Sequence, residues 1–234
     1  MHYSFLENAE INSDHYLDAE ESRHLVQVLR MKEGDEFGIL NGRGKLFKAE
    51  VFDPNKRSCG IKITELIREQ ELNENLVSIA VAPTKNISRT EWLVEKCTEI
   101  GLREMQFLQT SHSERTKIRI DRIERIAQSA VKQSVALYSP EIKEIQSINS
   151  WINSVDSEKN KFIAVVREGL PLLKDEAVKG ESCWVLIGPE GDFSKEEVEL
   201  AEEHGFKAVS LGDKRLRVET AALAACFTIN LINQ

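Results

Sequence analysis

From residue 76 onward, short and mainly apolar runs alternate with segments that carry helix-start signals. The apolar runs cover residues 76–82, 105–109, 162–166, 184–187 and 208–211. A strand that is apolar at every position is typical of a parallel sheet that is covered on both faces. This alternation of strand and helix therefore predicts an α/β domain, with a parallel sheet and helices on both sides of it.

Two tetrapeptides have the Ser-x-x-Glu spacing of a capping box, in which two side chains satisfy the first N–H groups of a helix. The box at 88–91 predicts a helix to residue 100, with Gly101 as its C-cap, in which Trp92 and Leu93 pack. The box at 194–197 predicts a helix that ends near residue 204. Further helices are expected at 121–137 and 219–232, with a connecting stretch that contains Trp151 between the first of these and the next strand.

The first 70 residues instead show the period-two alternation of strands, at 36–40, 46–52 and 58–67. The turn Asn41-Gly42-Arg43-Gly44 joins the first two strands into a hairpin, because glycine tolerates a positive φ. Leu25, Val28 and Leu29 have the spacing of one apolar helix stripe. A small β-barrel or curled sheet would bury such strands.

The polar, acidic stretch at 69–75 has no apolar period, and it predicts the boundary between two domains. We expect a β-rich domain at 1–70 and an α/β domain at 71–234.

Composition excludes several classes of protein. A net charge of −8 argues against a general coat for polyanions, although a local basic patch can still contact nucleic acid. No apolar run approaches the roughly 18 residues that cross a bilayer, and the first residues lack the pattern of a secretory signal. The four cysteines are isolated and the histidines are scattered, so we expect a reducing, cytoplasmic location and no metal site.

The tetrapeptide Gly188-Pro189-Glu190-Gly191 follows a predicted buried strand. In parallel α/β sheets, ligands bind in the loops beyond the carboxyl ends of the strands. The glycines allow a ligand to approach the backbone closely, but a plain strand-to-helix turn explains the tetrapeptide equally well. It is neither Gly-x-Gly-x-x-Gly nor a Walker loop, which disfavours a phosphate-gripping nucleotide enzyme.

A second loop, 211–220, follows the next predicted strand and carries Lys214, Arg215 and Arg217 within four residues. Its Glu219 or Thr220 could simply cap the following helix. A third basic stretch covers 111–119 and continues in Arg122, Arg125 and Lys132. The alternative interpretation of that stretch is an exposed helix face balanced by its acidic neighbours.

Together these motifs resemble the RsmE family, the 16S rRNA uridine-N3 methyltransferases of the SPOUT superfamily. The resemblance spans almost the whole chain and rests on 24–31, on 91–101 preceded by Lys85, and on the middle motifs 113–115 and 132–134. Its most specific parts are 186–191 and 211–212 with 216–221.

The resemblance implies an N-terminal PUA-like β-barrel and a C-terminal α/β domain tied in a trefoil knot. It also implies a homodimer that binds S-adenosylmethionine and methylates N3 of a uridine in 16S rRNA of the small ribosomal subunit. The implied cofactor-binding residues are Leu186, Gly188, Pro189, Glu190, Gly191, Leu211, Gly212, Leu216 and Arg217. The candidate RNA-binding residues are Arg23, Arg30, Arg115, Lys132, Gln133 and Arg215.

The sequence departs from the family pattern at three places. Asp192 stands where glycine commonly follows the Gly-Pro-Glu-Gly turn, and Arg215 replaces a usual apolar residue. Val135-Ala136 follows Gln133-Ser134 where the family often has Gly-Arg. These departures affect details of RNA contact more than cofactor binding.

For catalysis, the resemblance points to Arg217 and Glu219. Arg217 is the candidate cation for the negative charge that spreads onto uracil O2 and O4 as the N3 proton leaves. Glu219 would either accept that proton or orient Arg217. Two rival hypotheses remain: a non-catalytic RNA-binding factor of ribosome assembly, and a methyltransferase for another rRNA or tRNA nucleotide.

Overall fold

The computed structural model describes residues 1–71, 77–155 and 160–234. Its chain divides into two compact units. Unit 1 consists of Met1–Leu72 with Val131–Ser139, and unit 2 consists of Asn73–Ala130 with Pro140–Gln234. The predicted boundary stretch at 69–75 lies mostly outside the described residues.

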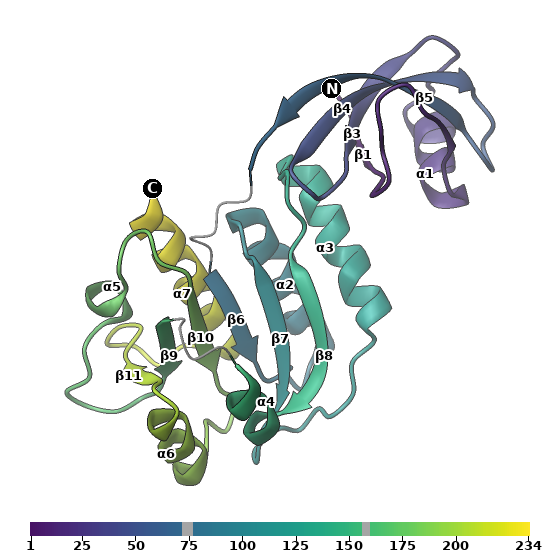
Figure 1. Ribbon diagram of the computed structural model, residues 1–234. Helices are drawn as coiled ribbons and strands as arrows, with labels where there is room; N and C mark the ends of the chain where they lie inside the picture. Colours follow the sequence, from purple (N-terminus) through teal and green to yellow (C-terminus); the bar gives the residue numbers. More distant parts are fainter. Residues whose placement is uncertain (72–76, 156–159) are drawn as a thin grey trace. The chain divides into compact units, whose positions relative to one another are not determined.

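Unit 1 is built on one curled sheet of five strands, in the order β1-β3-β4-β5-β2 (Figure 1). The strands are β1 (Tyr3–Phe5), β2 (Asp14–Tyr16), β3 (Glu36–Leu40), β4 (Lys45–Asp53) and β5 (Gly60–Glu69). All pairs are antiparallel except β1 with β3. The register of β4 and β5 shifts at three points, and such bulges bend and twist a sheet. The predicted curled sheet is confirmed.

The β3–β4 hairpin forms at the predicted turn. Gly42 and Gly44 have φ of 67° and 95°, the left-handed region that glycine enters at little cost. The side chain of Asn41 accepts the N–H groups of Arg43 and Lys45, at 2.9 and 3.0 Å. A short-range signal in the sequence is therefore sufficient to fix this hairpin.

The short helix of unit 1 differs from its prediction. Helix α1 (Ala19–Arg23), capped by Asp18, continues into the π-helix η1 (His24–Val28). Leu25 is fully buried, but Val28 and Leu29 are 65% and 40% exposed, so the predicted single stripe is wrong. A π-helix has more residues per turn than an α-helix, so Val28 at i+3 turns away from the face of Leu25, and Leu29 lies beyond the end of η1 as its C-cap.

Residues 131–139 pack with the strands of unit 1. Val131 and Leu137 share an apolar cluster with Leu40 and Leu46. The N–H of Gly44 donates to the carbonyl of Leu137 at 2.8 Å, which anchors this segment beside the hairpin.

Unit 2 contains a six-stranded parallel sheet in the order β11-β9-β10-β6-β7-β8. Its strands are β6 (Val77–Val81), β7 (Glu104–Gln109), β8 (Glu141–Ser147), β9 (Asn160–Ala164), β10 (Cys183–Ile187) and β11 (Lys207–Val209). Its helices are α2 (Ile87–Ile100), α3 (Ile120–Ser134, whose last turn belongs to unit 1), α4 (Ile148–Ser154), α5 (Leu173–Glu176), α6 (Lys195–Glu203) and α7 (Val218–Asn233). The predicted α/β class with a parallel sheet is confirmed.

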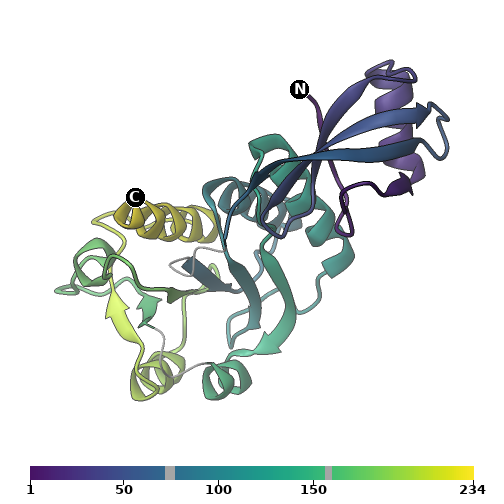
Figure 2. The ribbon, with the colours of Figure 1, turned by 45° about the horizontal axis from the view of Figure 1, so that its top comes forward.

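Helices cover both faces of this sheet. One apolar cluster joins α2, α5, α7 and the first part of α3 to alternate strand residues, including Val81, Phe107 and Val185. A second cluster joins α4 and α6 to the opposite face, through Trp151, Trp184 and Leu186. In Figure 2 the sheet is seen with α7 on one side of it and with α4 and α6 on the other. Strands buried on both faces explain the continuous apolar runs in the sequence.

Three local predictions in unit 2 are wrong. Helix α2 is capped by Asn86, whose side chain accepts the Ser88 N–H at 3.1 Å, so Ser88 does not begin a capping box. Leu93 is buried as expected, but Trp92 is 41% exposed. The stretch around Trp151 contains β8 and α4 rather than a plain connection. No helix among the described residues is long and apolar enough to cross a membrane.

Candidate active site

A cavity of about 900 Å³ opens at the carboxyl ends of the adjacent strands β11, β9 and β10. Three segments and one side chain form its wall. They are residues 164–170 and 172 from the end of β9 onward, 187–190 and 192 at the end of β10, 210–219 with 221 after β11, and Arg89. Parallel strands end at the same edge, so loops that are far apart in the sequence meet there. All of these residues belong to unit 2.

Most of the predicted cofactor residues lie in this wall. Gly188, Pro189, Glu190, Leu211, Gly212, Leu216 and Arg217 all line the cavity. Two do not: Leu186 is fully buried in β10, and Gly191 faces His112, whose Cβ would lie 3.1 Å from a Cβ added at that glycine. The structure thus brings the two predicted loops together at one cavity. Leu186 and Gly191 lie outside the wall that these loops form.

The loop after β10 is held in a tight turn. The N–H of Asp192 donates to the Pro189 carbonyl at 3.0 Å, and Asp192 itself has a φ of 65°. A Cβ added at Gly188 would lie 3.1 Å from the ring of Phe193, so the close packing of that ring favours a residue without a side chain. Helix α6 follows, and its predicted capping box between Ser194 and Glu197 is confirmed.

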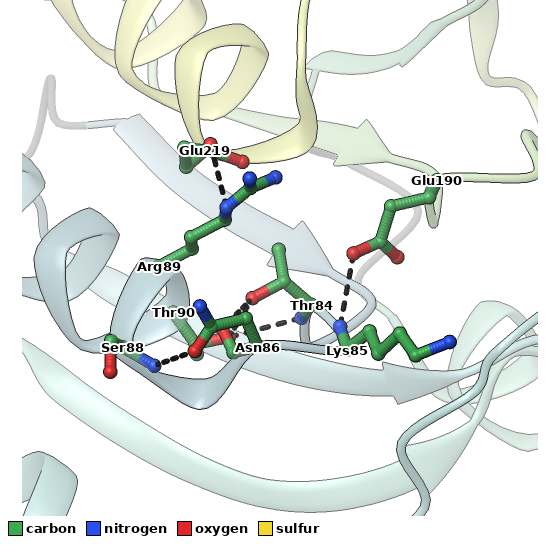
Figure 3. A network of polar contacts seen from close by, with 8 residues as sticks. All are labelled: Thr84, Lys85, Asn86, Ser88, Arg89, Thr90, Glu190 and Glu219. Atoms are coloured by element: carbon green, nitrogen blue, oxygen red, sulfur yellow. Dashed lines mark hydrogen bonds and ion pairs between the residues drawn. The ribbon is translucent and has the colours of Figure 1, made fainter.

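The predicted catalytic residues lie two positions apart at the start of α7. Arg217 is the N-cap residue and is exposed, and its guanidinium makes no ion pair or hydrogen bond within the described part of the chain. Glu219 lies in the first helical turn, where the helix dipole favours a negative charge. Its carboxylate faces Arg89 across the cavity wall, with 3.7 Å between Glu219 Oε1 and Arg89 Nε (Figure 3).

The predicted RNA-binding residues are dispersed. Arg215 lines the cavity, and Arg23, Arg30 and Gln133 are exposed on unit 1. Lys132 forms an ion pair with Glu21 within unit 1. The sixth, in unit 2, is Arg115, whose guanidinium donates to the backbone carbonyls of Thr84 and Lys85.

Two parts of the wall are not among the residues predicted from the sequence. Arg89 lies in the first turn of α2, and residues 165–170 and 172 follow β9. The rule that ligands bind beyond the carboxyl ends of strands could have identified the loop after β9, because β9 was itself predicted as a buried strand. Nothing local marks Arg89, since its partner Glu219 is distant in the sequence.

Comparison with known proteins agrees with this geometry. The sequence model of the RNA methyltransferase domain matches residues 71–230, and that of the RNA methyltransferase PUA domain matches residues 17–64. The curated relative Ribosomal RNA small subunit methyltransferase E of Bacillus subtilis is 28% identical over 92% of this chain and 88% of its own length. The relative of the same name in Rickettsia conorii is 25% identical over 95% of this chain and 89% of its own.

Two solved structures extend the comparison to three dimensions. A "probable rRNA-methyltransferase" from Porphyromonas gingivalis is 38% identical, with a TM-score of 0.92 over 100% of this chain and 98% of the other. A Ribosomal RNA small subunit methyltransferase E from Neisseria gonorrhoeae, bound to S-adenosylmethionine, is 25% identical with a TM-score of 0.86 over 100% of this chain and 98% of the other. With its sequence, its two units and its cavity in agreement, the chain belongs to the RNA methyltransferase family.

Proposed function

We propose that this protein uses S-adenosylmethionine to methylate N3 of a uridine in 16S rRNA. The observation that carries the proposal is the cavity at the carboxyl ends of β9, β10 and β11, with Arg217 and Glu219 at its wall. The names of the relatives, which are small-subunit rRNA methyltransferases, and the S-adenosylmethionine bound to the Neisseria gonorrhoeae structure support it.

The cavity fits a ligand of this kind. Its volume of about 900 Å³ lies within the range of small-molecule sites, roughly 300–1,000 Å³. Leu211 and Leu216 offer apolar surface for an aromatic base, and a Cβ added at Gly212 would meet no atom within 4 Å, so backbone is exposed there. When it is bound, the cofactor supplies an activated methyl group on a sulfonium. Glu190 at the wall suits a ligand that carries positive charge.

The remaining work belongs to the residues of the chain. Uracil N3 becomes a nucleophile only when its proton leaves and negative charge spreads to O2 and O4. We assign Arg217 to stabilise that charge, because its guanidinium is not engaged within the described residues. Glu219 is held at the wall by Arg89. That placement suits either accepting the proton or orienting Arg217.

Unit 1 would help to hold the RNA. Arg23, Arg30 and Gln133 are exposed there and can contact phosphates and bases. Lys132 is expected to join them when its ion pair with Glu21 opens. The proposed substrate places the protein in the cytoplasm, with the small ribosomal subunit as its partner.

We also propose that the protein is a homodimer and that its α/β domain contains the trefoil knot implied by the resemblance. Phe227 and Leu231 are 54% and 57% exposed, and their spacing of four residues places both on one face of α7. Exposed apolar side chains on one helix face favour association with a second copy. Light scattering should show a dimer, and Leu231→Glu should shift it toward monomer.

Nucleoside mass spectrometry of 16S rRNA tests the function directly. Cells that lack the protein should lose 3-methyluridine, and the purified protein with S-adenosylmethionine should restore it on their small subunits. Unchanged 3-methyluridine would contradict the proposed substrate. A wild-type protein that fails to bind S-adenosylmethionine in calorimetry would instead favour a non-catalytic assembly factor.

A further inference from the structure

One arginine of the basic stretch at 111–119 is turned toward the protein rather than toward solvent. Arg115 lies in the loop between β7 and α3 and is only partly exposed. Its Nε donates to the carbonyl of Thr84 at 3.1 Å, and one of its Nη atoms donates to the carbonyl of Lys85 at 2.7 Å. A planar guanidinium can hold two neighbouring carbonyls in this way, whereas an ammonium cannot reproduce the same fork.

The segment that Arg115 holds is the one that contacts the cavity loop. The backbone N–H of Lys85 donates to Glu190 Oε1 at 3.0 Å, as Figure 3 shows. Thr84 is 1% exposed, and its side chain and N–H bond to Thr90 at the start of α2. The Lys85 N–H therefore has a fixed direction, and Glu190 accepts a charge-assisted hydrogen bond from it.

The loop between β7 and α3, which carries Arg115, also contacts helix α6 and the turn after β10. Glu197 Oε1 accepts the N–H of Ser111 at 2.7 Å and its hydroxyl at 3.0 Å. His112 Nδ1 lies 2.9 Å from the carbonyl oxygen of Asp192. The loops after β6, β7 and β10 thus form a closed ring of contacts. From the loop after β7, the side chain of Arg115 reaches the loop after β6, and that of His112 reaches the loop after β10.

We propose that Arg115 is a positioning residue for the cofactor cavity: it fixes Thr84 and Lys85 so that the Lys85 N–H holds Glu190 at the wall. This proposal rests on the proposed function, since it takes S-adenosylmethionine as the ligand of the cavity. It differs from the role expected from the sequence, in which Arg115 binds RNA. The two roles differ in what they predict when no RNA is present. A positioning role predicts that loss of the Arg115 side chain weakens cofactor binding, whereas a role in RNA binding predicts no change.

Calorimetric titration with S-adenosylmethionine, without RNA, separates the two roles. Arg115→Ala should raise the Kd for the cofactor about tenfold, because the hydrogen bond to a charged group loses its support. Arg115→Lys should recover only part of this loss. Arg119→Ala is the matched control: it removes the same charge from an exposed side chain that bonds only Asp121 among the described residues, and it should leave the Kd unchanged.

A double-mutant cycle tests the path through Glu190. In a Glu190→Ala background, Arg115→Ala should change the cofactor Kd by less than about twofold, because its effect is already lost. Thermal melting of each variant identifies any that fails to fold. The proposal is overturned if Arg115→Ala binds S-adenosylmethionine like the wild type and weakens only RNA binding, or if the two substitutions act additively. A wild-type protein that does not bind the cofactor would refute the proposed function itself.

Discussion

At the scale of single residues, Asp192 and Val135 both adopt left-handed backbone conformations, with φ of 65° and 56°. Such a φ costs an L-residue with a side chain roughly 1–2 kcal/mol, less for Asp than for a β-branched residue. These are two of the positions at which the sequence departs from a glycine of the family it resembles. The backbone therefore keeps the conformation of a glycine while the side chain has changed.

We expect the Asp192 side chain to offset part of this cost. Its Oδ1 accepts the N–H of Phe193 at 2.8 Å. Asp192→Ala should destabilise the protein by about 1 kcal/mol, because it keeps the strained φ and loses this bond. Asp192→Gly should be nearly neutral, since the bond is lost but the strain is relieved. Urea unfolding would measure both, with Asp213→Ala as an exposed control; equal destabilisation by Ala and Gly would contradict this account.

Arg217 carries the strongest catalytic prediction. Arg217→Ala should lower kcat by roughly 10²–10³-fold, the usual loss when one group that stabilises a developing oxyanion is removed. Arg217→Lys should retain part of the activity, because it keeps the charge without the fork. Single-turnover kinetics at saturating cofactor would measure the change, and a calorimetric Kd would separate catalysis from binding. Near-normal turnover in Arg217→Ala would remove it from the mechanism.

The sequence predicts where the residues of the site lie, but not which residues they contact. The loops that carry Arg217 and Glu190 could be placed at one edge, because each follows an apolar strand. The partners could not be predicted: Glu219 meets Arg89, and Glu190 meets the N–H of Lys85. Each pair joins segments that only the order of the strands brings together. Spacing within the sequence holds no information about such contacts.

At the scale of helices and strands, a local sequence signal predicts a helix start correctly when no neighbouring residue can cap the helix instead. The box at Ser194 and Glu197 forms as predicted, but α2 begins earlier than the predicted box, with Asn86 as its N-cap and the Asn86 side chain accepting the N–H of Ser88. Strand β8 was missed because it is an edge strand with sequence Glu-Ile-Lys-Glu-Ile-Gln-Ser, in which the two isoleucines are three residues apart. An apolar spacing of three favours a helix over a strand in any periodicity test.

Glu197 gives the element-scale prediction, because it links helix α6 to the loop after β7. It is 5% exposed, and its carboxylate accepts the N–H of Ser194 at 2.8 Å and both donors of Ser111. Glu197→Ala should destabilise the protein by about 3 kcal/mol, since buried donors lose a charged acceptor. Glu197→Gln should cost about 1 kcal/mol because it keeps one acceptor oxygen. Chemical denaturation would show this, and Glu199→Ala, exposed on the same helix, should be near neutral.

At the scale of the whole molecule, the chain forms two units with separate apolar cores. The change of sequence pattern near residue 70 predicts two domains. Before it, apolar and polar residues alternate with period two, and after it the predicted strands are mainly apolar runs. The assignment of 131–139 to the packing of unit 1 could not be predicted, because it continues an amphipathic helix without a break. A pattern within a helix reports which face is buried, but not which neighbour buries it.

The four cysteines allow the unfolding of the two cores to be measured separately. All are buried thiols: Cys59 lies in the core of unit 1, and Cys97, Cys183 and Cys226 lie in unit 2. Burial raises the pKa of Cys183 to about 12 and also raises that of Cys59, so neither forms the reactive thiolate in the native protein at mildly alkaline pH. A thiol reagent should therefore leave the folded protein unmodified. As denaturant is raised, Cys59 should be labelled in one transition and the other three together in another, because each group depends on its own core. Mass spectrometry of labelled peptides would resolve the order, and labelling of all four thiols in a single step would mean that the units unfold as one.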